Sequence, residues 1–186
     1  MSIVSLKSTS GAPGISTLAT ALTLNWPRPA LLLEADIAKT SHILSGYLRG
    51  QYQHVQSLTE AAIANLRGGM DGETLFAQTI SLGEGRYVIP GFNDLGGARG
   101  TTSAFWANLL RALEQLPRTA AAPDLDIIVD DHLEDFVGVA SAHEDFDALV
   151  VIAEDFEEAR KDVGADGGCG ADEEAACCAF AGAFEH

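Results

Sequence analysis

Short, mostly apolar runs alternate with stretches of helical periodicity along much of the chain. An uninterrupted apolar run is typical of a strand that is covered on both faces. Such runs predict strands at residues 3–6, 30–33, 86–89, 125–130 and 148–152. Because strands that alternate with helices build βαβ units, the pattern predicts a three-layer α/β fold with a mostly parallel sheet.

Helical periodicity predicts the elements between these strands. The first helix places apolar residues at spacings of three and four, on one face: Ile15, Leu18, Ala19 and Leu22. The prolines of Trp26–Pro29 end this helix, because proline interrupts the helical hydrogen bonds. A second helix is expected from about Ala38 to Leu48.

A third helix is expected to begin at Ser57, which forms a capping-box pattern with Glu60, and to end at Gly68. A glycine-rich loop is expected from Pro90 to Gly100. The following helix, about Ser103 to Leu116, places large residues on one face, where they are expected in the core: Trp106, Leu109, Leu110, Leu113 and Leu116.

The composition changes towards the end of the chain. A short acidic helix is expected near Phe156–Val163, and residues 164–186 are rich in glycine, alanine and acids with little periodicity. Such a segment buries too little apolar surface to fold by itself, so we expect it to be disordered. The predicted organisation is one domain over residues 1–163 and an acidic tail over residues 164–186.

The charge is distributed unevenly. The chain has a formal net charge of −16, of which residues 1–129 carry −1 and residues 130–186 carry −15. An acidic surface repels phosphates, which disfavours direct binding to nucleic acid or to anionic lipid. No apolar run approaches the roughly 20 residues of a membrane span, and no secretion signal is evident, so we expect a cytoplasmic protein.

The cysteines do not form a metal-binding pattern. Cys169, Cys177 and Cys178 lie in the acidic tail, two of them adjacent, without a C-x-x-C pair. This spacing is poor for zinc, and we interpret them as reduced, incidental thiols.

A glycine-rich segment joins the first predicted strand to the first predicted helix: Gly11, Ala12, Pro13, Gly14, Ile15, Ser16 and Thr17. A turn of this kind directs backbone N–H groups and the positive end of the helix dipole at one point, which suits a phosphate. A phosphate-binding loop usually has a lysine before its hydroxyl residue, but Ile15 stands in the lysine position and Ser16 in the hydroxyl position. The segment therefore predicts nucleotide binding with little catalysis, or else a plain strand-to-helix turn.

Acidic residues follow two of the predicted strands. Glu34 and Asp36 come after residues 30–33, and Asp130 ends the run at 125–130. In a parallel sheet these strand ends meet beside the glycine-rich loop. Ser16 and Asp130 could therefore hold Mg²⁺. One of Glu34 and Asp36 could position an attacking water, and we choose Asp36 for this role. The alternatives are a helix-capping role for Glu34 and Asp36, and a solvated acidic loop at Asp130.

The histidines show no partner spacing. We expect His42, His54, His132 and His143 on the surface.

Taken together, these motifs resemble the ParA/MinD family of P-loop ATPases. The resemblance rests on the first strand and its loop, on Leu31–Asp36, on Val88–Gly91 and on Ile127–Asp130, and it covers residues 2–130 well and 147–160 loosely. It implies a P-loop NTPase-like fold and an adenine nucleotide, ATP or ADP, with Mg²⁺. It further implies a homodimer or another protein partner, with a role in partitioning chromosomes or plasmids or in positioning cell machinery.

The loop departs from the family pattern at both lysines. Ser10 replaces the first lysine and Ile15 the second. The form Gly-Ala-Pro-Gly followed by Ser-Thr resembles a divergent bacterial MinD-like branch. The resemblance then implies weak nucleotide binding through Gly11, Gly14, Ser16 and Thr17 with little hydrolysis. An active ATPase with an atypical loop, and a structural domain that no longer binds nucleotide, remain the alternatives.

Overall fold

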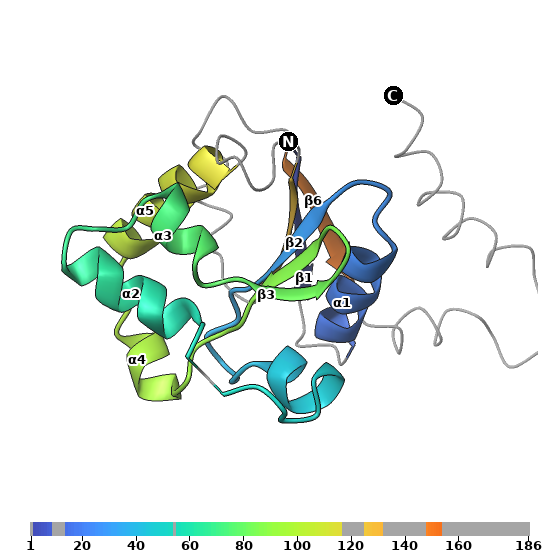
Figure 1. Ribbon diagram of the computed structural model, residues 1–186, viewed down its shortest axis with the longest axis horizontal. Helices are drawn as coiled ribbons and strands as arrows, with labels where there is room; N and C mark the ends of the chain where they lie inside the picture. The colour runs from blue at the N-terminus through green and yellow to red at the C-terminus, as the bar shows by residue number, and fades with distance from the viewer. Residues whose placement is uncertain (1, 9–13, 54, 117–124, 132–147, 154–186) are drawn as a thin grey trace, which may run out of the picture. The chain divides into compact units, whose positions relative to one another are not determined.

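The computed structural model describes residues 2–8, 14–53, 55–116, 125–131 and 148–153 (Figure 1). Several sequence predictions lie outside these ranges: the loop residues Gly11, Ala12 and Pro13, the acidic helix near residues 156–163, the tail with its cysteines, and three of the histidines.

One sheet of six strands, in the order β3-β4-β2-β5-β1-β6, forms the centre of the fold. The strands are β1 Ile3–Ser8, β2 Ala30–Glu34, β3 Ile80–Gly83, β4 Arg86–Ile89, β5 Asp126–Asp130 and β6 Ala148–Ala153. All neighbouring pairs are parallel except β3 and β4, which are antiparallel. The predicted α/β class with a mostly parallel sheet is therefore confirmed, and so are the five predicted strands.

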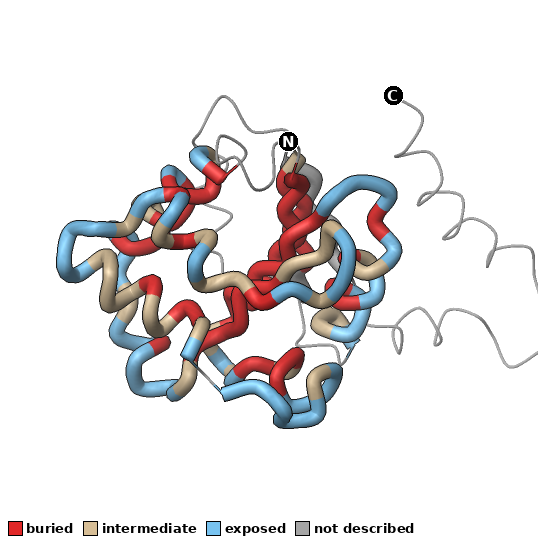
Figure 2. The backbone as a smooth tube through the Cα atoms, in the orientation of Figure 1, coloured by how far each residue is buried: buried red, intermediate tan, exposed pale blue. Residues whose placement is uncertain are grey.

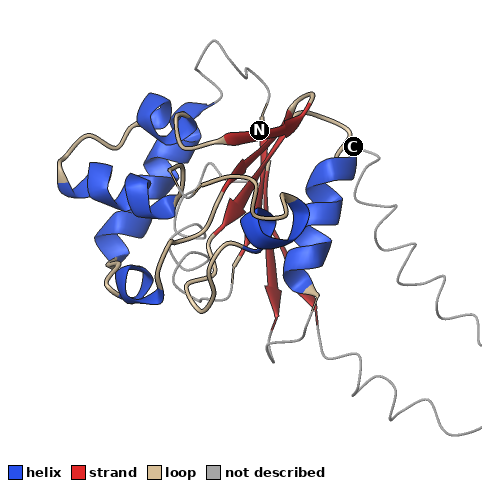
Figure 3. Ribbon diagram, turned by 60° about the horizontal axis from the view of Figure 1, so that its bottom comes forward, coloured by secondary structure: helices blue, strands red, loops and turns tan. Residues whose placement is uncertain are grey.

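Helices cover both faces of the sheet, which gives the three predicted layers (Figures 1 and 3). One face carries α1 Ile15–Asn25 and the π-helix η1 Ile43–Tyr47; the other carries α2 Leu58–Leu66, α3 Gly72–Phe76, α4 Leu95–Arg99 and α5 Ser103–Gln115.

The burial pattern follows from this arrangement. Successive residues of a strand point to opposite faces, so Leu31 and Leu33 pack on the α5 side while Leu32 packs on the α1 side. All five residues of β2 are buried, as Figure 2 shows for the central strands. No helix in the described part of the chain is long and apolar enough to cross a membrane.

The helix α5 is confirmed together with its apolar face. All five of its predicted core residues are buried, the least buried being Trp106 at 3% exposure. Two short helices were not predicted. Asp71 begins α3 by accepting a hydrogen bond from the Thr74 N–H, and Asp94 begins α4, inside the predicted glycine-rich loop, by accepting one from the Gly97 N–H.

The helix α1 is confirmed, but its predicted face is partly wrong. Ala19 is buried, whereas Leu18 is 37% exposed, and Thr20 and Thr23 are buried instead. The threonine hydroxyls donate hydrogen bonds to the carbonyl oxygens of Ser16 and Ala19. Since this satisfies the hydroxyls within the helix, they can face the core at little cost.

The helix α2 is also confirmed, but the predicted capping box is not formed. Ser57 is the N-cap residue of α2, yet its side chain makes no capping hydrogen bond. Its Oγ is buried and lacks a hydrogen-bond partner in the part of the chain that the structure describes. The helix is positioned here by packing of Leu58 and Ala61 into the core rather than by its cap.

The predicted helix at residues 38–48 forms only in its second half. The segment contains turns followed by η1, which spans only five residues. Two carboxylates reorganise its backbone. Asp36 accepts from the Ala38 N–H at 2.8 Å, and Glu34 accepts from the N–H groups of His42 and Ile43 at 3.0 and 3.1 Å. The Asp36 bond is compatible with a helix start, but the bonds to Glu34 occupy the His42 and Ile43 N–H groups, which a regular helix from Ala38 would use for its own hydrogen bonds.

Candidate functional site

The candidate site lies where β2 and β5 end beside the start of α1. In the sheet register, Asp130 of β5 is the partner of both Leu6 of β1 and Glu34 of β2. These carboxyl ends therefore meet at one edge, as the sequence predicts. Ligands of open parallel sheets bind at this edge.

The start of α1 has the geometry of a phosphate-binding turn. Gly14 is the N-cap residue with a φ of 114°, a left-handed conformation that side chains rarely adopt. Gly14 has no side chain with which to cap the first turn. Such a turn suits an anion, because the first N–H groups of a helix have no partner within it.

The three predicted residues that follow Gly14 have different surroundings. Ile15 is partly buried and packs against the apolar cluster between α1 and the sheet. Ser16 is partly buried, and Thr17 is exposed. The residue in the lysine position of the loop therefore contributes to the core.

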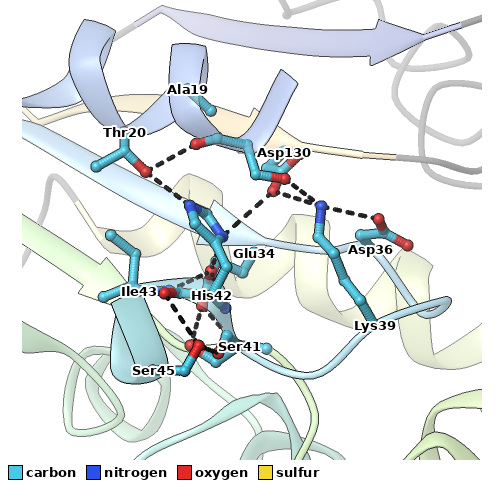
Figure 4. Close-up of polar contacts among 12 residues, drawn as sticks. Ala19, Thr20, Glu34, Asp36, Lys39, Ser41, His42, Ile43, Ser45 and Asp130 are labelled. Atoms are coloured by element: carbon cyan, nitrogen blue, oxygen red, sulfur yellow. Dashed lines mark hydrogen bonds and ion pairs between the residues drawn. The ribbon is translucent and has the colours of Figure 1, made fainter. Parts of the chain in front are cut away.

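Lys39 joins Asp36 to Asp130 at this edge (Figure 4). Its Nζ lies 2.9 Å from Asp36 Oδ2 and 3.3 Å from Asp130 Oδ2. Its Nζ also donates to the Oγ of Ser16. Burial lowers the pKa of Lys39, but Asp130 and Asp36 outweigh this effect, so the pKa lies above its ordinary value of 10.5. The side chain is therefore a stable cation.

Glu34 organises the backbone around the site. Its carboxylate accepts hydrogen bonds from Ser41 Oγ, from the N–H groups of His42 and Ile43, and from the Gly91 N–H at 3.1 Å. Burial raises the pKa of Glu34, but the bonds from His42 and Ser41 outweigh it, so the pKa lies below its ordinary value of 4.5. Glu34 thus accepts hydrogen bonds from backbone N–H groups at the start of η1, in keeping with the capping alternative.

Gly91 permits the close approach of its loop to β2. A Cβ at this position would lie 3.3 Å from the carbonyl oxygen of Glu34, which is closer than most such contacts. The Val88–Gly91 segment therefore helps to hold Glu34 in place.

His42 is not the surface residue that the sequence predicts. Its side chain is 28% exposed, with Nδ1 2.5 Å from Glu34 Oε1 and 3.9 Å from Asp130 Oδ2. Its Nε2 lies 2.9 Å from the hydroxyl of Thr20 on α1. His42 therefore links α1 to the ends of β2 and β5.

Asp130 is buried, with 1% exposure. The alternative of a solvated acidic loop is therefore wrong for this residue. Its neighbour Asp131 is also buried, at 2%. A carboxylate buried to this degree requires a compensating cation or hydrogen bonds, and here Lys39 supplies a cation.

At this edge of the sheet, two sets of side chains among the described residues offer ligand atoms for a metal ion. Ligand atoms of Glu34, His42 and Asp130 lie within 4.8 Å of one another. However, Glu34 already accepts four hydrogen bonds, so this set fits a metal poorly. The oxygens of Ser16, Asp36 and Asp130 are the donors that Mg²⁺ prefers, but the Lys39 ammonium lies among them.

Three of the predicted site residues are thus brought together: Ser16, Asp36 and Asp130. Sequence reasoning missed Lys39 and His42. A signal for Lys39 was present, because a lysine three residues after a strand-end aspartate can return to that carboxylate in a turn. No local signal indicates His42, whose contacts on α1 and β5 are distant in sequence.

Comparisons with known proteins support the fold. A ParA family ATPase from Chlorobium tepidum TLS matches with a TM-score of 0.52 and 14% identity, covering 80% of this chain and 59% of that chain. A candidate plasmid partition protein from Borrelia burgdorferi B31, bound to AMPPNP, matches with a TM-score of 0.53 and 20% identity, covering 81% and 60%. No protein-family model matches the sequence, and neither does any curated protein.

The fold of this chain is that of the ParA-like P-loop ATPases. At these identities the similarity defines the fold alone. The chain spans about 60% of the length of the two matched structures.

Proposed function

We propose that this chain is a ParA-like nucleotide-binding protein that binds ATP or ADP weakly at the start of α1 and hydrolyses it little. One observation carries the proposal: the glycine-capped start of α1 opens at the sheet edge where Ser16, Asp36 and Asp130 meet. The similarity to a structure bound to AMPPNP supports an adenine nucleotide. In this proposal Gly11–Thr17 contact the phosphates.

The charges at this edge explain why binding is weak. Two carboxylates, Asp36 and Asp130, surround the single ammonium of Lys39. The net charge of these three groups opposes an incoming phosphate, whereas the Lys39 ammonium, the helix dipole and the backbone N–H groups at the start of α1 favour it. Ile15 adds no cation, because it is an apolar side chain packed against the core.

The contacts of Asp36 explain why hydrolysis is slow. Its carboxylate accepts a hydrogen bond from the Ala38 N–H and pairs with Lys39. A carboxylate held in this way is a poor partner for an attacking water. The loop also lacks the clamping cation that stabilises charge in phosphoryl transfer.

The biological role follows the same family resemblance. We propose that nucleotide binding switches a cytoplasmic homodimer, or a complex with a protein partner, that partitions chromosomes or plasmids or positions cell machinery. Sedimentation velocity with and without nucleotide tests the dimer. A sedimentation coefficient that nucleotide leaves unchanged contradicts the switch.

Titration with a fluorescent ATP analogue tests binding. We expect saturable binding in the micromolar to millimolar range and phosphate release close to background. Gly14→Ala should weaken binding about tenfold or more, because it strains the turn at a φ of 114°. Gly68→Ala is the matched control, since Gly68 also has a positive φ, 74°, but follows α2 on the other face of the sheet.

The outcomes separate the candidates. No saturable binding up to millimolar nucleotide contradicts the proposal and favours a structural domain. Equal loss in Gly14→Ala and Gly68→Ala places the nucleotide elsewhere.

A second candidate is an active Mg²⁺-dependent ATPase with an atypical loop. The observation that favours it is the gathering of oxygen donors from Ser16, Asp36 and Asp130. In this candidate Ser16 and Asp130 hold Mg²⁺ and Asp36 orients water. Phosphate release that depends on Mg²⁺ and is lost in Asp36→Asn supports it.

A further inference from the structure

Lys39 places a cation at the start of a helix, where a positive charge is normally unfavourable. Its Nζ contacts the hydroxyl of Ser16, the second residue of α1. The helix dipole carries partial positive charge at this end, so an ammonium there requires nearby anions. Asp36 and Asp130 supply them at 2.9 and 3.3 Å.

The partners of Lys39 are the atoms that would bind a divalent cation at this edge. A serine hydroxyl and two carboxylates from separate strand ends form an oxygen set suited to Mg²⁺. One position among them cannot hold both an ammonium and a metal ion at contact distance. Lys39 and Mg²⁺ are therefore competitors for the same oxygens.

The backbone holds Lys39 at this position. The Asp36 carboxylate accepts from the Ala38 N–H at 2.8 Å, which closes a tight turn directly before Lys39. Glu34 fixes the backbone of His42 and Ile43 on the other side. Because both flanks are anchored, the lysine is directed at the oxygens with a reduced entropic cost.

We propose that Lys39 replaces Mg²⁺ in this protein as a built-in cation, so that nucleotide phosphates bind without a divalent metal. The inference rests on the proposed function for its nucleotide part. The side chain is 37% exposed, and its ammonium contacts Ser16 in the first turn of α1, the end of the helix that favours an anion. The lysine then supplies one positive charge where Mg²⁺ would supply two, which is in keeping with weak nucleotide binding.

The first test uses metal alone and needs no nucleotide. Mn²⁺, which can be followed by electron paramagnetic resonance, is titrated into the wild type, Lys39→Met and Arg67→Met. Arg67 is a matched control, because it is an exposed cation at the end of α2. We expect Lys39→Met to bind Mn²⁺ at least about tenfold more tightly than the other two proteins.

Additional variants make the metal test specific. Lys39→Gln should give the same gain, and it replaces Lys39→Met if that variant fails to fold. Adding Ser16→Ala to either variant should abolish the gain, since it removes one of the vacated oxygens. Equal Mn²⁺ affinity in the wild type and the Lys39 variants overturns the proposal.

The second test uses the fluorescent ATP analogue with Mg²⁺ or with EDTA. The wild type should show the same affinity within about twofold in both, whereas Lys39→Met should lose about tenfold in EDTA and recover it with Mg²⁺. A wild-type affinity that rises tenfold with Mg²⁺ overturns the proposal. If the wild type binds no nucleotide in either condition, the proposed function fails, and the Mn²⁺ titration still decides the role of Lys39.

Discussion

The two ends of β5 carry buried aspartates that are held in different ways. Asp126, at the amino end, has 0% exposure and accepts hydrogen bonds at 2.8 Å from the Ser2 N–H and from the Trp26 indole N–H. Arg28 lies 2.7 Å from the same carboxylate. This aspartate therefore joins the start of β1 and the end of α1 to β5.

Asp130, at the carboxyl end, is buried almost as deeply. Among the described residues, its Oδ2 accepts no main-chain hydrogen bond and lies 3.3 Å from Lys39 Nζ and 3.9 Å from His42 Nδ1. The long, half-buried side chain of Lys39 can move away from Asp130, whereas the main-chain N–H of Ser2 cannot move away from Asp126. The comparison indicates that Asp126 stabilises the fold, while the ion-pair contacts of Asp130 can be exchanged more easily.

Replacement of Asp126 should have the largest effect on stability. Asp126→Ala removes a buried carboxylate that accepts hydrogen bonds from a main-chain N–H and an indole N–H and pairs with a half-exposed arginine. Hydrogen bonds to a buried charge contribute about 1.5–3 kcal/mol each, and loss of one partner of a buried pair costs about 3–5 kcal/mol. We expect the free energy of unfolding, measured by urea denaturation, to fall by about 4 kcal/mol.

Arg28→Met provides the control for that prediction. The Arg28 side chain is 52% exposed, so its ion pair should contribute less than about 1 kcal/mol. An Arg28→Met loss as large as that of Asp126→Ala would show that the ion pair, rather than the buried hydrogen bonds, stabilises this end of β5.

Glu34 should show an intermediate effect that depends on pH. Glu34→Gln places an amide among four donors, and we expect a loss of about 2 kcal/mol at pH 7. The pKa of Glu34 is lowered in the folded state, so its contribution is complete above the unfolded value of 4.5 and is lost as the pH falls through the folded value. The difference between wild type and Glu34→Gln should therefore shrink below about pH 4.5.

Urea denaturation at a series of pH values measures this difference. Glu84→Gln, at an exposed glutamate in the turn between β3 and β4, is the matched control and should be neutral throughout. A Glu34→Gln difference that grows as the pH falls would contradict the assignment of the carboxylate as an acceptor.

Local patterns predicted the parts of the molecule that depend on local physics. The strands and α5 follow from apolar runs and from helical periodicity, and both are confirmed. Ser16, Asp36 and Asp130 could be placed together because the carboxyl ends of parallel strands share one edge. Applying this rule requires knowledge of the fold class only, not of individual side-chain contacts.

The segment after β2 could not be predicted in this way. Residues 38–48 have apolar residues at helical spacing, but Glu34 binds N–H groups eight and nine positions later. Contacts of one side chain with a distant backbone leave no periodic trace. The same segment positions Lys39 and His42. The incorrect helix bounds and the two site residues that were not predicted therefore have one cause.

The smallest expected effect is the coupling between Asp130 and Lys39. The Lys39 side chain is 37% exposed and also pairs with Asp36, so loss of Asp130 leaves its charge solvated and partnered. A double-mutant cycle of Asp130→Asn and Lys39→Met, read by urea denaturation, should give a coupling free energy of about 1 kcal/mol or less. A value above about 2 kcal/mol would mean that the pair is a structural unit like the one at Asp126, and that Asp130 is not readily available to a ligand.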